Sequence, residues 1–272
     1  MRLALVGTGT IGMYLLDAIA GGMAGPIDVV AIADLPGRAD HLGRLAARYG
    51  SAWHTDPLAV LQAAPDIVVE AAAPDVVRAF AARWLDGGAS VLTMSVGALA
   101  DPALLRDLAA TAERSGCRVL VPTGAIAGLD AIRAARIGGL EIVELRTTKP
   151  PRALKGAPYL VAAGVDVEAF IEPTVVFDGS ATEAVVGFPA NLNVVAALSL
   201  AGIGPDRTRV VLVADPTGER NVHEITARGA FGELSVRLEN RPMPDNPKTS
   251  LLAPLSALAL LRRLSDPVEV GS

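Results

Sequence analysis

The chain begins with a short apolar run and three spaced glycines, Leu3-Ala4-Leu5-Val6-Gly7-Thr8-Gly9-Thr10-Ile11-Gly12. The run predicts a buried β-strand, and residues 11–20 predict a helix directly after the glycines. A Gly-x-Gly-x-x-Gly motif in this setting is typical of a turn that binds a dinucleotide. Its first glycine permits the turn, its second leaves room for a pyrophosphate, and its third lets the helix pack against the strand. Because the N–H groups at the helix start attract phosphate, the predicted contacts are Gly7, Gly9, Thr10, Ile11 and Gly12. A glycine-rich turn without a ligand is the alternative.

The first 120 residues contain further strands and helices that place this turn in a larger domain. Apolar runs that are continuous rather than alternating are separated by helical stretches. Such strands indicate a parallel sheet covered on both faces, which is the doubly wound α/β fold. The predicted strands are 3–6, 28–34, 66–70, 90–94 and 118–121, and the predicted helices are 11–20, 41–49, 75–85 and 102–115. We therefore expect a Rossmann domain over residues 1–122.

The rest of the chain has a different pattern. Predicted strands lie at 141–148, 174–178, 209–215, 219–228 and 232–239, with a helix at 189–200 and a hairpin turn at 229–232. They predict a second, α+β domain with a mixed or antiparallel sheet over residues 123–245. A final helix over 246–272 is expected to have Asn246 as N-cap and Pro247 at its first position. Pro254 is expected to bend or interrupt that helix.

Composition and charge limit the class of protein. The 272 residues are 51% hydrophobic and 19% charged, which suffices for a core and excludes global disorder. A net charge of −5 argues against a nucleic-acid-binding protein or a basic membrane-surface protein. The single cysteine, Cys117, rules out an intrachain disulfide and fits a reducing compartment, so we expect a cytoplasmic protein. With three histidines, no metal site is expected, and no apolar stretch approaches the ~20 residues of a membrane-spanning helix.

Asp34 ends the second predicted strand, at the place where an acidic residue binds the adenosine ribose in this fold. A carboxylate there favours NAD, because it repels the 2′-phosphate of NADP. Arg38 is near enough to pair with that phosphate, so NADP stays possible, and a turn-forming aspartate is the alternative reading. Small residues follow three other strands, among them Ala72, Ser95 and Ala125, and they leave room for a flat ring. In an alanine-rich chain, composition alone also explains them.

His223 is the most informative titratable residue. On the predicted strand 219–228 it shares a largely apolar face with Asn221, Ile225 and Ala227. A neutral imidazole in such a place can act as acid or base near pH 7. A hydrogen-bonded core histidine is the alternative, and spacing alone favours it.

Three further polar sites have two readings each. Asn193 is either a helix cap or an amide that points at a cofactor. Lys149, before two prolines, either meets a carboxylate or is solvated. Residues 246–250 either cap the last helix or present donors to an anion at its start.

Segments along nearly the whole chain resemble one known family. The segments are residues 5–12, 66–72, 94–101, 124–131, 188–194, 215–216, 221–224 and 246–250. The first is common to many dehydrogenases, and the later ones, such as Asn221-Val222-His223-Glu224, are far more specific. On these residues the sequence resembles the L-aspartate dehydrogenases, nicotinamide-dependent enzymes associated with NAD biosynthesis.

The resemblance implies roles for particular residues. The family's catalytic histidine falls on His223, which reverses the reading from spacing alone, and its cofactor contacts fall near Ala125 and on Asn193. Ala127 replaces the first glycine of the family's usual Gly-Gly pair, and a backbone contact would survive that change. The resemblance also implies a last helix that returns to the first domain, and a homodimer.

The implied reaction oxidises L-aspartate. Hydride passes from Cα to C4 of the nicotinamide, and water converts the product iminosuccinate to oxaloacetate and ammonia. His223 is the candidate that takes a proton from the ammonium group or activates the water. The two substrate carboxylates need cationic or N–H partners, for which the candidates are Lys149, Asn246 and Thr249.

Two other classes remain open from the sequence. One is a different two-domain reductase, acting for example on dihydrodipicolinate or homoserine, which would share the N-terminal signals but not the segment 221–224. The other is a sensor that binds the nicotinamide cofactor without turnover and does not depend on His223.

Overall fold

The computed structural model describes residues 1–189, 192–268 and 270–271. The chain divides into two compact units, of which one comprises Met1–Pro122 and the segment that begins at Pro254. The other is built from Thr123–Ala253. Among the described residues, no helix combines the length and the apolar character needed to cross a bilayer.

The first unit contains a six-stranded sheet in the order β3-β2-β1-β4-β5-β6, in which every pair is parallel. Its strands are β1 (Arg2–Val6), β2 (Asp28–Ala33), β3 (Ala52–His54), β4 (Ile67–Glu70), β5 (Ser90–Thr93) and β6 (Val119–Leu120). The strand order reverses between β1 and β4, which is where a doubly wound sheet binds its ligand. The predicted Rossmann topology is therefore confirmed.

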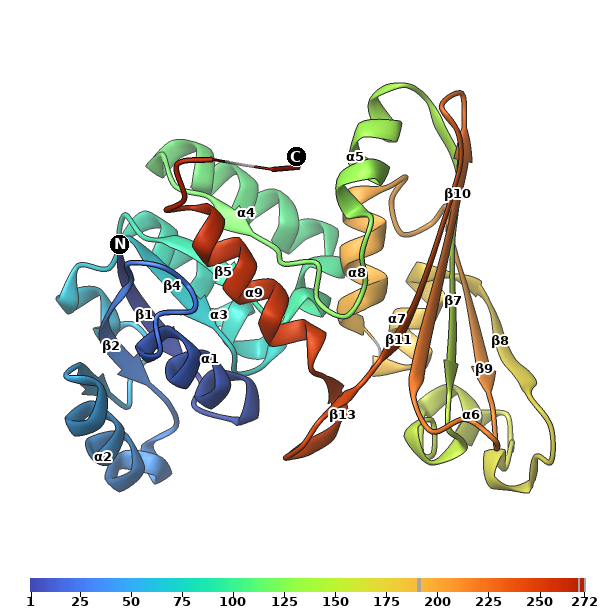
Figure 1. The fold of residues 1–272 in the computed structure, drawn as a ribbon, viewed down its shortest axis with the longest axis horizontal. Helices are drawn as coiled ribbons and strands as arrows, with labels where there is room; N and C mark the ends of the chain where they lie inside the picture. The colour runs from blue at the N-terminus through green and yellow to red at the C-terminus, as the bar shows by residue number, and fades with distance from the viewer. Residues whose placement is uncertain (190–191, 269, 272) are drawn as a thin grey trace. The chain divides into compact units, whose positions relative to one another are not determined.

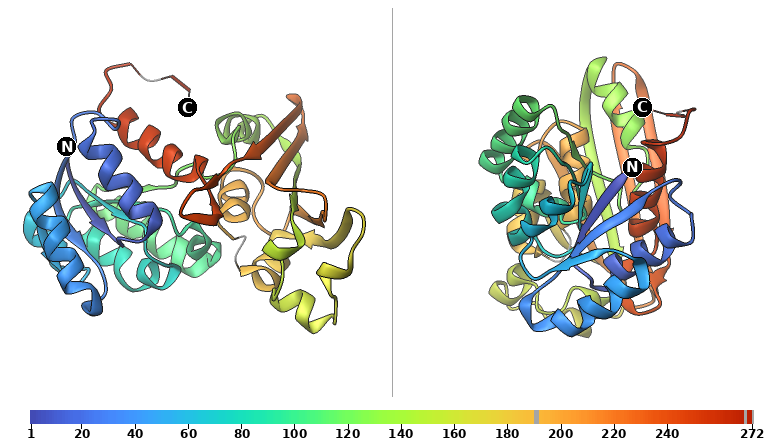
Figure 2. Two further views of the ribbon diagram at one scale, coloured as in Figure 1. Left: turned by 60° about the horizontal axis from the view of Figure 1, so that its bottom comes forward. Right: turned by 90° about the vertical axis from the view of Figure 1, so that its left-hand side faces the viewer.

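Helices cover both faces of this sheet. They are α1 (Thr10–Ala20), α2 (Ala39–Tyr49), α3 (Pro74–Asp86), α4 (Pro102–Ser115) and α9 (Leu252–Arg263). α3 and α4 lie on one face, while α1 and α9 lie on the other (Figures 1 and 2). The unit also has 3-10 turns η1 (Pro36–Arg38), η2 (Ala59–Ala63) and η3 (Val96–Ala100).

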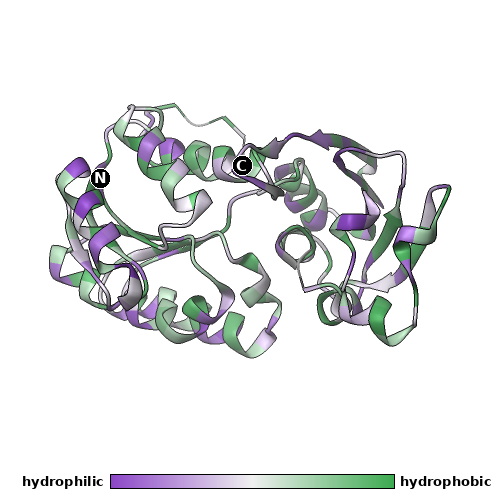
Figure 3. Ribbon diagram, turned by 90° about the horizontal axis from the view of Figure 1, so that it is seen from below, coloured by the Kyte–Doolittle hydropathy of each residue, from purple (hydrophilic) through white to green (hydrophobic). Residues whose placement is uncertain are grey.

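The core of the first unit is formed by the central strands and the inner helix faces. Leu3, Leu5 and Val69 are fully buried on β1 and β4. Each buried aliphatic side chain of this size contributes about 2 kcal/mol of transfer free energy. Trp84 on α3 is also fully buried, and its indole N–H donates to the Pro57 carbonyl at 2.9 Å. The helices of this unit carry both apolar and polar residues (Figure 3), as expected where one face of a helix packs on the sheet and the other meets solvent.

The second unit contains a five-stranded mixed sheet in the order β11-β10-β7-β9-β8. Its strands are β7 (Leu140–Lys149), β8 (Thr174–Ser180), β9 (Thr208–Ala214), β10 (Asn221–Gly229) and β11 (Gly232–Asn240). The β7–β9 pair is parallel and the other pairs are antiparallel, so the predicted mixed sheet is confirmed. Ala230 and Phe231 form the turn of the β10–β11 hairpin.

One face of this sheet is covered by helices (Figure 1). They are α5 (Leu129–Ile137), α7 (Ala181–Gly187) and α8 (Leu192–Ala201); α6 (Pro158–Ala162) and the turns η4 (Pro151–Ala153) and η5 (Val167–Ala169) lie between β7 and β8. Val143, Leu145 and Thr147 are buried on the covered face of β7, whereas Ile142 is 48% exposed on the other. His223, Ile225 and Ala227 of β10 are buried in the same alternating way.

The prediction for residues 246–250 is wrong. Asn246–Ser250 is strand β13, which pairs with β12 (Pro242–Met243) in a small separate sheet, and helix α9 begins at Leu252. Asn246 is therefore no N-cap, and Pro247 is not at a helix start. Pro254 lies in the first turn of α9, where a missing N–H removes no helical hydrogen bond, so it does not interrupt the helix.

Candidate functional site

The glycine-rich turn between β1 and α1 has the shape of a phosphate cradle. Gly7 has a φ of +99°, and a Cβ there would lie 2.6 Å from the backbone carbon of Ala71. A Cβ on Gly12 would lie 2.0 Å from the Gly7 carbonyl oxygen, so only glycine fits. A Cβ on Gly9, in contrast, would meet no atom within 4 Å. Gly9 therefore borders open space at the start of α1, whose first N–H groups, at Thr10, Ile11 and Gly12, have no acceptor within the helix.

Asp34 holds this turn against the end of β2. Its Oδ2 accepts hydrogen bonds from the Thr8 N–H at 2.8 Å and the Thr8 hydroxyl at 2.5 Å. Arg38 pairs with the same oxygen at 3.1 Å, while the Leu35 N–H donates to Oδ1 at 2.7 Å. Burial by itself would raise the pKa of Asp34, but these hydrogen bonds and the charge of Arg38 lower it below its usual value. The carboxylate therefore shapes the turn, and Oδ1 is the oxygen with spare accepting capacity.

Glu70 joins the loops that follow β4 and β5, and it was not predicted from the sequence. It is fully buried at the end of β4. Oε1 accepts from the Ala72 N–H and the Ser95 hydroxyl, both at 2.8 Å. Oε2 accepts from the Thr93 hydroxyl at 2.7 Å and the Ser95 N–H at 3.1 Å. Two of the predicted cofactor contacts, Ala72 and Ser95, are thus held by one carboxylate. The available signal was an acidic residue at the end of an otherwise apolar strand.

In the second unit, His223 is directly opposite Thr147 on the neighbouring strand β7. Its Nδ1 lies 2.9 Å from the Thr147 hydroxyl, and both side chains are buried. Burial first, and then the charge of Lys149, lower the pKa of His223 to about 3. The imidazole is therefore neutral near pH 7, and Thr147 fixes which ring nitrogen faces away from β7.

Lys149 shares the covered face of the sheet with His223, because it follows Thr147 by two residues on β7. Burial lowers the pKa of Lys149 to about 8. The backbone of β7 is fixed at this point by β9, and the Asp215 N–H donates to the Lys149 carbonyl at 2.8 Å. A half-buried ammonium that is still mostly charged at pH 7 is suited to receive an anionic group.

Ala125 is attached to the same sheet by a second residue that was not predicted from the sequence. The side-chain amide of Asn240 donates to the Ala125 carbonyl at 2.9 Å, and both residues are buried. Asn240 pairs with Asn221 across β11 and β10, two residues along from His223. The network thus connects the loop around Ala125 with the end of the sheet that carries the histidine.

Within each unit, several predicted residues come together. In the first unit, the glycine turn adjoins Asp34 through Thr8 and the loop of Ala72 through Ala71. In the second, Lys149 influences His223. Asn193 is in the first turn of α8 with an exposed side chain. Asn246 and Thr249 belong to β13, whose partner is β12 rather than the five-stranded sheet.

No group of three or more His, Cys, Asp or Glu residues suited to a metal occurs in the described part of the chain.

Comparisons with known protein families give a match for each of the two units. The family described as "Aspartate dehydrogenase, C-terminal" matches residues 130–264. The family described as "Homoserine dehydrogenase, NAD binding domain" matches residues 7–122. The chain has an NAD-binding domain followed by a second domain typical of aspartate dehydrogenases.

Relatives match the chain over its whole length. An L-aspartate dehydrogenase of Methanocella arvoryzae is 45% identical, with 100% of this chain and 99% of that protein covered. An L-aspartate dehydrogenase of Methanosarcina barkeri is 42% identical, with both chains covered completely. The crystal structure of aspartate dehydrogenase from Thermotoga maritima is similar with a TM-score of 0.75 and 26% identity, covering 100% of this chain and 99% of that one. The chain belongs to the L-aspartate dehydrogenase family.

Proposed function

We propose that the protein oxidises L-aspartate with NAD(P)⁺ to iminosuccinate, which water hydrolyses to oxaloacetate and ammonia. The reverse reaction is the reductive amination of oxaloacetate. The observation that carries the proposal is the placement of His223, buried, and Lys149, half-buried, on one sheet face, with the imidazole held by Thr147. The pair supplies a neutral base beside a cation, which suits a substrate with an ammonium group and two carboxylates.

Lys149 is the proposed partner of a substrate carboxylate. A pKa of about 8 leaves its ammonium mostly charged at pH 7, so it can form a charge-assisted hydrogen bond. The surrounding burial strengthens such a contact, because little water competes for it. Asn246 and Thr249 remain proposed substrate contacts, presented by strand β13 rather than by a helix start.

His223 is the proposed proton acceptor. For this role Nδ1–H donates to the Thr147 hydroxyl, which leaves the lone pair of Nε2 for the proton of the substrate ammonium. In the free protein, burial and Lys149 lower the pKa of the ring to about 3. Substrate carboxylates offset the charge of Lys149 and add negative charge of their own, which raises the affinity of the ring for a proton. Binding of the substrate thus prepares its own base. Activation of the water that hydrolyses iminosuccinate is a second task that fits the same nitrogen.

The first unit has the features that hold a dinucleotide. Gly9 borders open space where a pyrophosphate fits, and the adjacent helix start supplies N–H donors. The residues that would hold the cofactor are Gly7, Gly9, Thr10, Ile11, Gly12, Asp34, Ala72, Ser95, Ala125 and Asn193. When bound, the nicotinamide supplies the hydride acceptor. Asp34 favours NAD by its charge, whereas Arg38 offers a partner for the 2′-phosphate of NADP.

The test is the absorbance of reduced nicotinamide in the presence of NADH, oxaloacetate and ammonium, for the wild type and His223→Ala. We expect NADH consumption in the wild type and at least a ~100-fold lower kcat in the variant. Equal turnover in both proteins would remove His223 from the mechanism. Turnover only with dihydrodipicolinate or aspartate semialdehyde would identify another reductase, and cofactor binding without any turnover would identify a sensor.

We further propose a homodimer in the cytoplasm. The family resemblance supports the dimer, and the single cysteine supports the reducing compartment. Light scattering coupled to size-exclusion chromatography measures the first. A monomeric mass at assay concentrations would contradict it.

A further inference from the structure

Glu70 is a buried carboxylate that the proposed reaction does not use. It is fully buried at the carboxyl end of β4, and its two oxygens receive four hydrogen bonds. Two come from backbone N–H groups, of Ala72 and Ser95, and two come from the hydroxyls of Thr93 and Ser95. All four donors belong to β5 or to the loops that follow β4 and β5.

The four donors require a side chain that only accepts. An ionised carboxylate has about four accepting positions and no hydrogens, which matches this set. A glutamine of the same shape has one accepting oxygen, and its NH₂ group would face the backbone N–H of either Ala72 or Ser95. Neither N–H can turn away, since each is fixed by the backbone. The carboxylate is therefore needed for the conformation of both loops, and a neutral side chain of the same size could not replace it.

These loops belong to the half of the sheet that faces the nicotinamide. A doubly wound sheet consists of two mononucleotide-binding halves, which meet between β1 and β4. Asp34 directly follows β2 and marks the adenosine half, so the half of β4 and β5 receives the nicotinamide nucleotide. The glycine turn adjoins the same loops, because a Cβ on Gly7 would lie 2.6 Å from the backbone carbon of Ala71 and 2.7 Å from the backbone nitrogen of Ala72. Glu70 thus holds the two loops that follow β4 and β5, and the first of these loops adjoins the glycine turn.

From this placement we infer that Glu70 is a positioning residue for the nicotinamide half of the cofactor. It holds the backbone of Ala72 and Ser95 in the conformation that accepts the nicotinamide nucleotide, and it leaves the adenosine half unaffected. The inference rests on the cofactor site described under the proposed function. It goes beyond that site because it assigns Glu70 to the affinity for the nicotinamide nucleotide and not to the affinity for the adenosine nucleotide.

The test is calorimetric titration of Glu70→Gln with NAD and, separately, with ADP, which lacks the nicotinamide nucleotide. We expect the Kd for NAD to rise about tenfold or more, because one buried donor loses its acceptor and the loops rearrange. The Kd for ADP should stay within about twofold, since the glycine turn and Asp34 are unchanged. Equal weakening of both ligands, or an unchanged Kd for NAD, would overturn the inference. If the wild type bound neither ligand, the cofactor site itself would be wrong.

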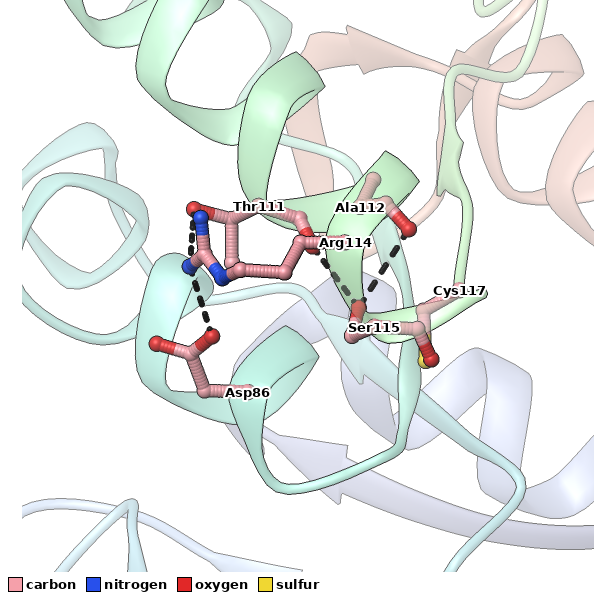
Figure 4. A network of polar contacts seen from close by, with 6 residues as sticks. All are labelled: Asp86, Thr111, Ala112, Arg114, Ser115 and Cys117. Carbon is pink, nitrogen blue, oxygen red and sulfur yellow. Dashed lines mark hydrogen bonds and ion pairs between the residues drawn. The ribbon is translucent and has the colours of Figure 1, made fainter.

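Two more variants keep the test decisive. Thr93→Val keeps the size of the side chain but removes one of the four donors to Glu70 and, with it, a second acceptor of the Ser95 N–H at 3.1 Å. Three hydrogen bonds to Glu70 remain, so the variant should weaken NAD selectively but by less than Glu70→Gln. It answers the question if Glu70→Gln does not fold. Thr111→Val is the matched control, since Thr111 is a buried threonine of the same unit on α4. Its hydroxyl accepts from Arg114, which also pairs with Asp86, so it belongs to a network separate from Glu70 (Figure 4). Selective loss of NAD affinity in this control would show that the readout is not specific.

Discussion

Replacing Thr147 by valine tests how His223 is held. The substitution keeps the branched shape but removes the hydroxyl that lies 2.9 Å from Nδ1 in a buried position. Leaving a buried polar group without a partner costs about 1–3 kcal/mol. If that loss falls on the orientation of the base, kcat should fall by about 5- to 150-fold, at 1.36 kcal/mol for each factor of ten. The KM for NAD should not change, because the glycine turn and Asp34 are untouched.

The assay is steady-state oxidation of L-aspartate, with kcat and both KM values determined for each variant. Thr208→Val is the control, because Thr208 is a buried threonine of β9 in the same unit whose hydroxyl donates to the Gly204 carbonyl at 2.7 Å. The control should lose stability and retain its kcat. A Thr147→Val protein with the kcat of the wild type would refute the assignment of His223 as a base oriented by this hydroxyl. A loss of kcat that equals the loss in Thr208→Val would also refute it.

Three further predictions concern charges in the two units. Lys149→Ala should raise the KM for L-aspartate by about 100-fold, because one charge-assisted hydrogen bond in a half-buried site is lost. An unchanged KM in steady-state kinetics would remove Lys149 from the substrate site. Arg38→Ala should raise the KM for NADP while the KM for NAD stays constant, because the Arg38 guanidinium, which pairs with Asp34, is the candidate partner of the 2′-phosphate. Parallel changes in the KM for both cofactors would argue against this role. The folded pKa of His223, about 3, lies below its ordinary value of 6.5, so the unfolded chain binds the extra proton first as the pH falls. Stability should therefore be retained above pH 6.5 and decline by about 5 kcal/mol toward pH 3, and urea unfolding of His223→Gln should lack this part of the decline.

The first unit was predictable because its signals are local. An apolar strand, a glycine turn and a helix follow one another within residues 3–20. The structure gives Gly7 and Gly12 a steric reason, while Gly9 borders open space, as the sequence spacing indicates. β3 was missed because it is only three residues long, lies at the edge of the sheet, and exposes Trp53. Its pairing with β2, rather than its own composition, makes it a strand.

The errors and omissions have a common physical origin. Asn246-Pro247 has the local chemistry of a helix start, but pairing with β12 across a short turn determines the backbone there. Glu70 and Asn240 were not singled out, because most of their partners are distant in the chain. Thr93 and Ser95 follow Glu70 by 23 and 25 residues, and the Ala125 carbonyl lies 115 residues before Asn240. Thr147 likewise becomes informative only through the register of β7 and β10. Sequence patterns specify elements well, whereas hydrogen bonds between elements need the folded chain.

The division of the chain into units has a consequence for biosynthesis. The second unit is formed by one continuous stretch, Thr123–Ala253, while the first unit includes the segment that begins at Pro254. A ribosome therefore delivers every residue of that stretch before it delivers most of α9, the last helix of the first unit. Domains fold as units during synthesis, usually from the N-terminus onward. The nucleotide-binding unit, although its synthesis starts first, is complete only once α9 has emerged, after the whole of Thr123–Ala253 has been synthesised.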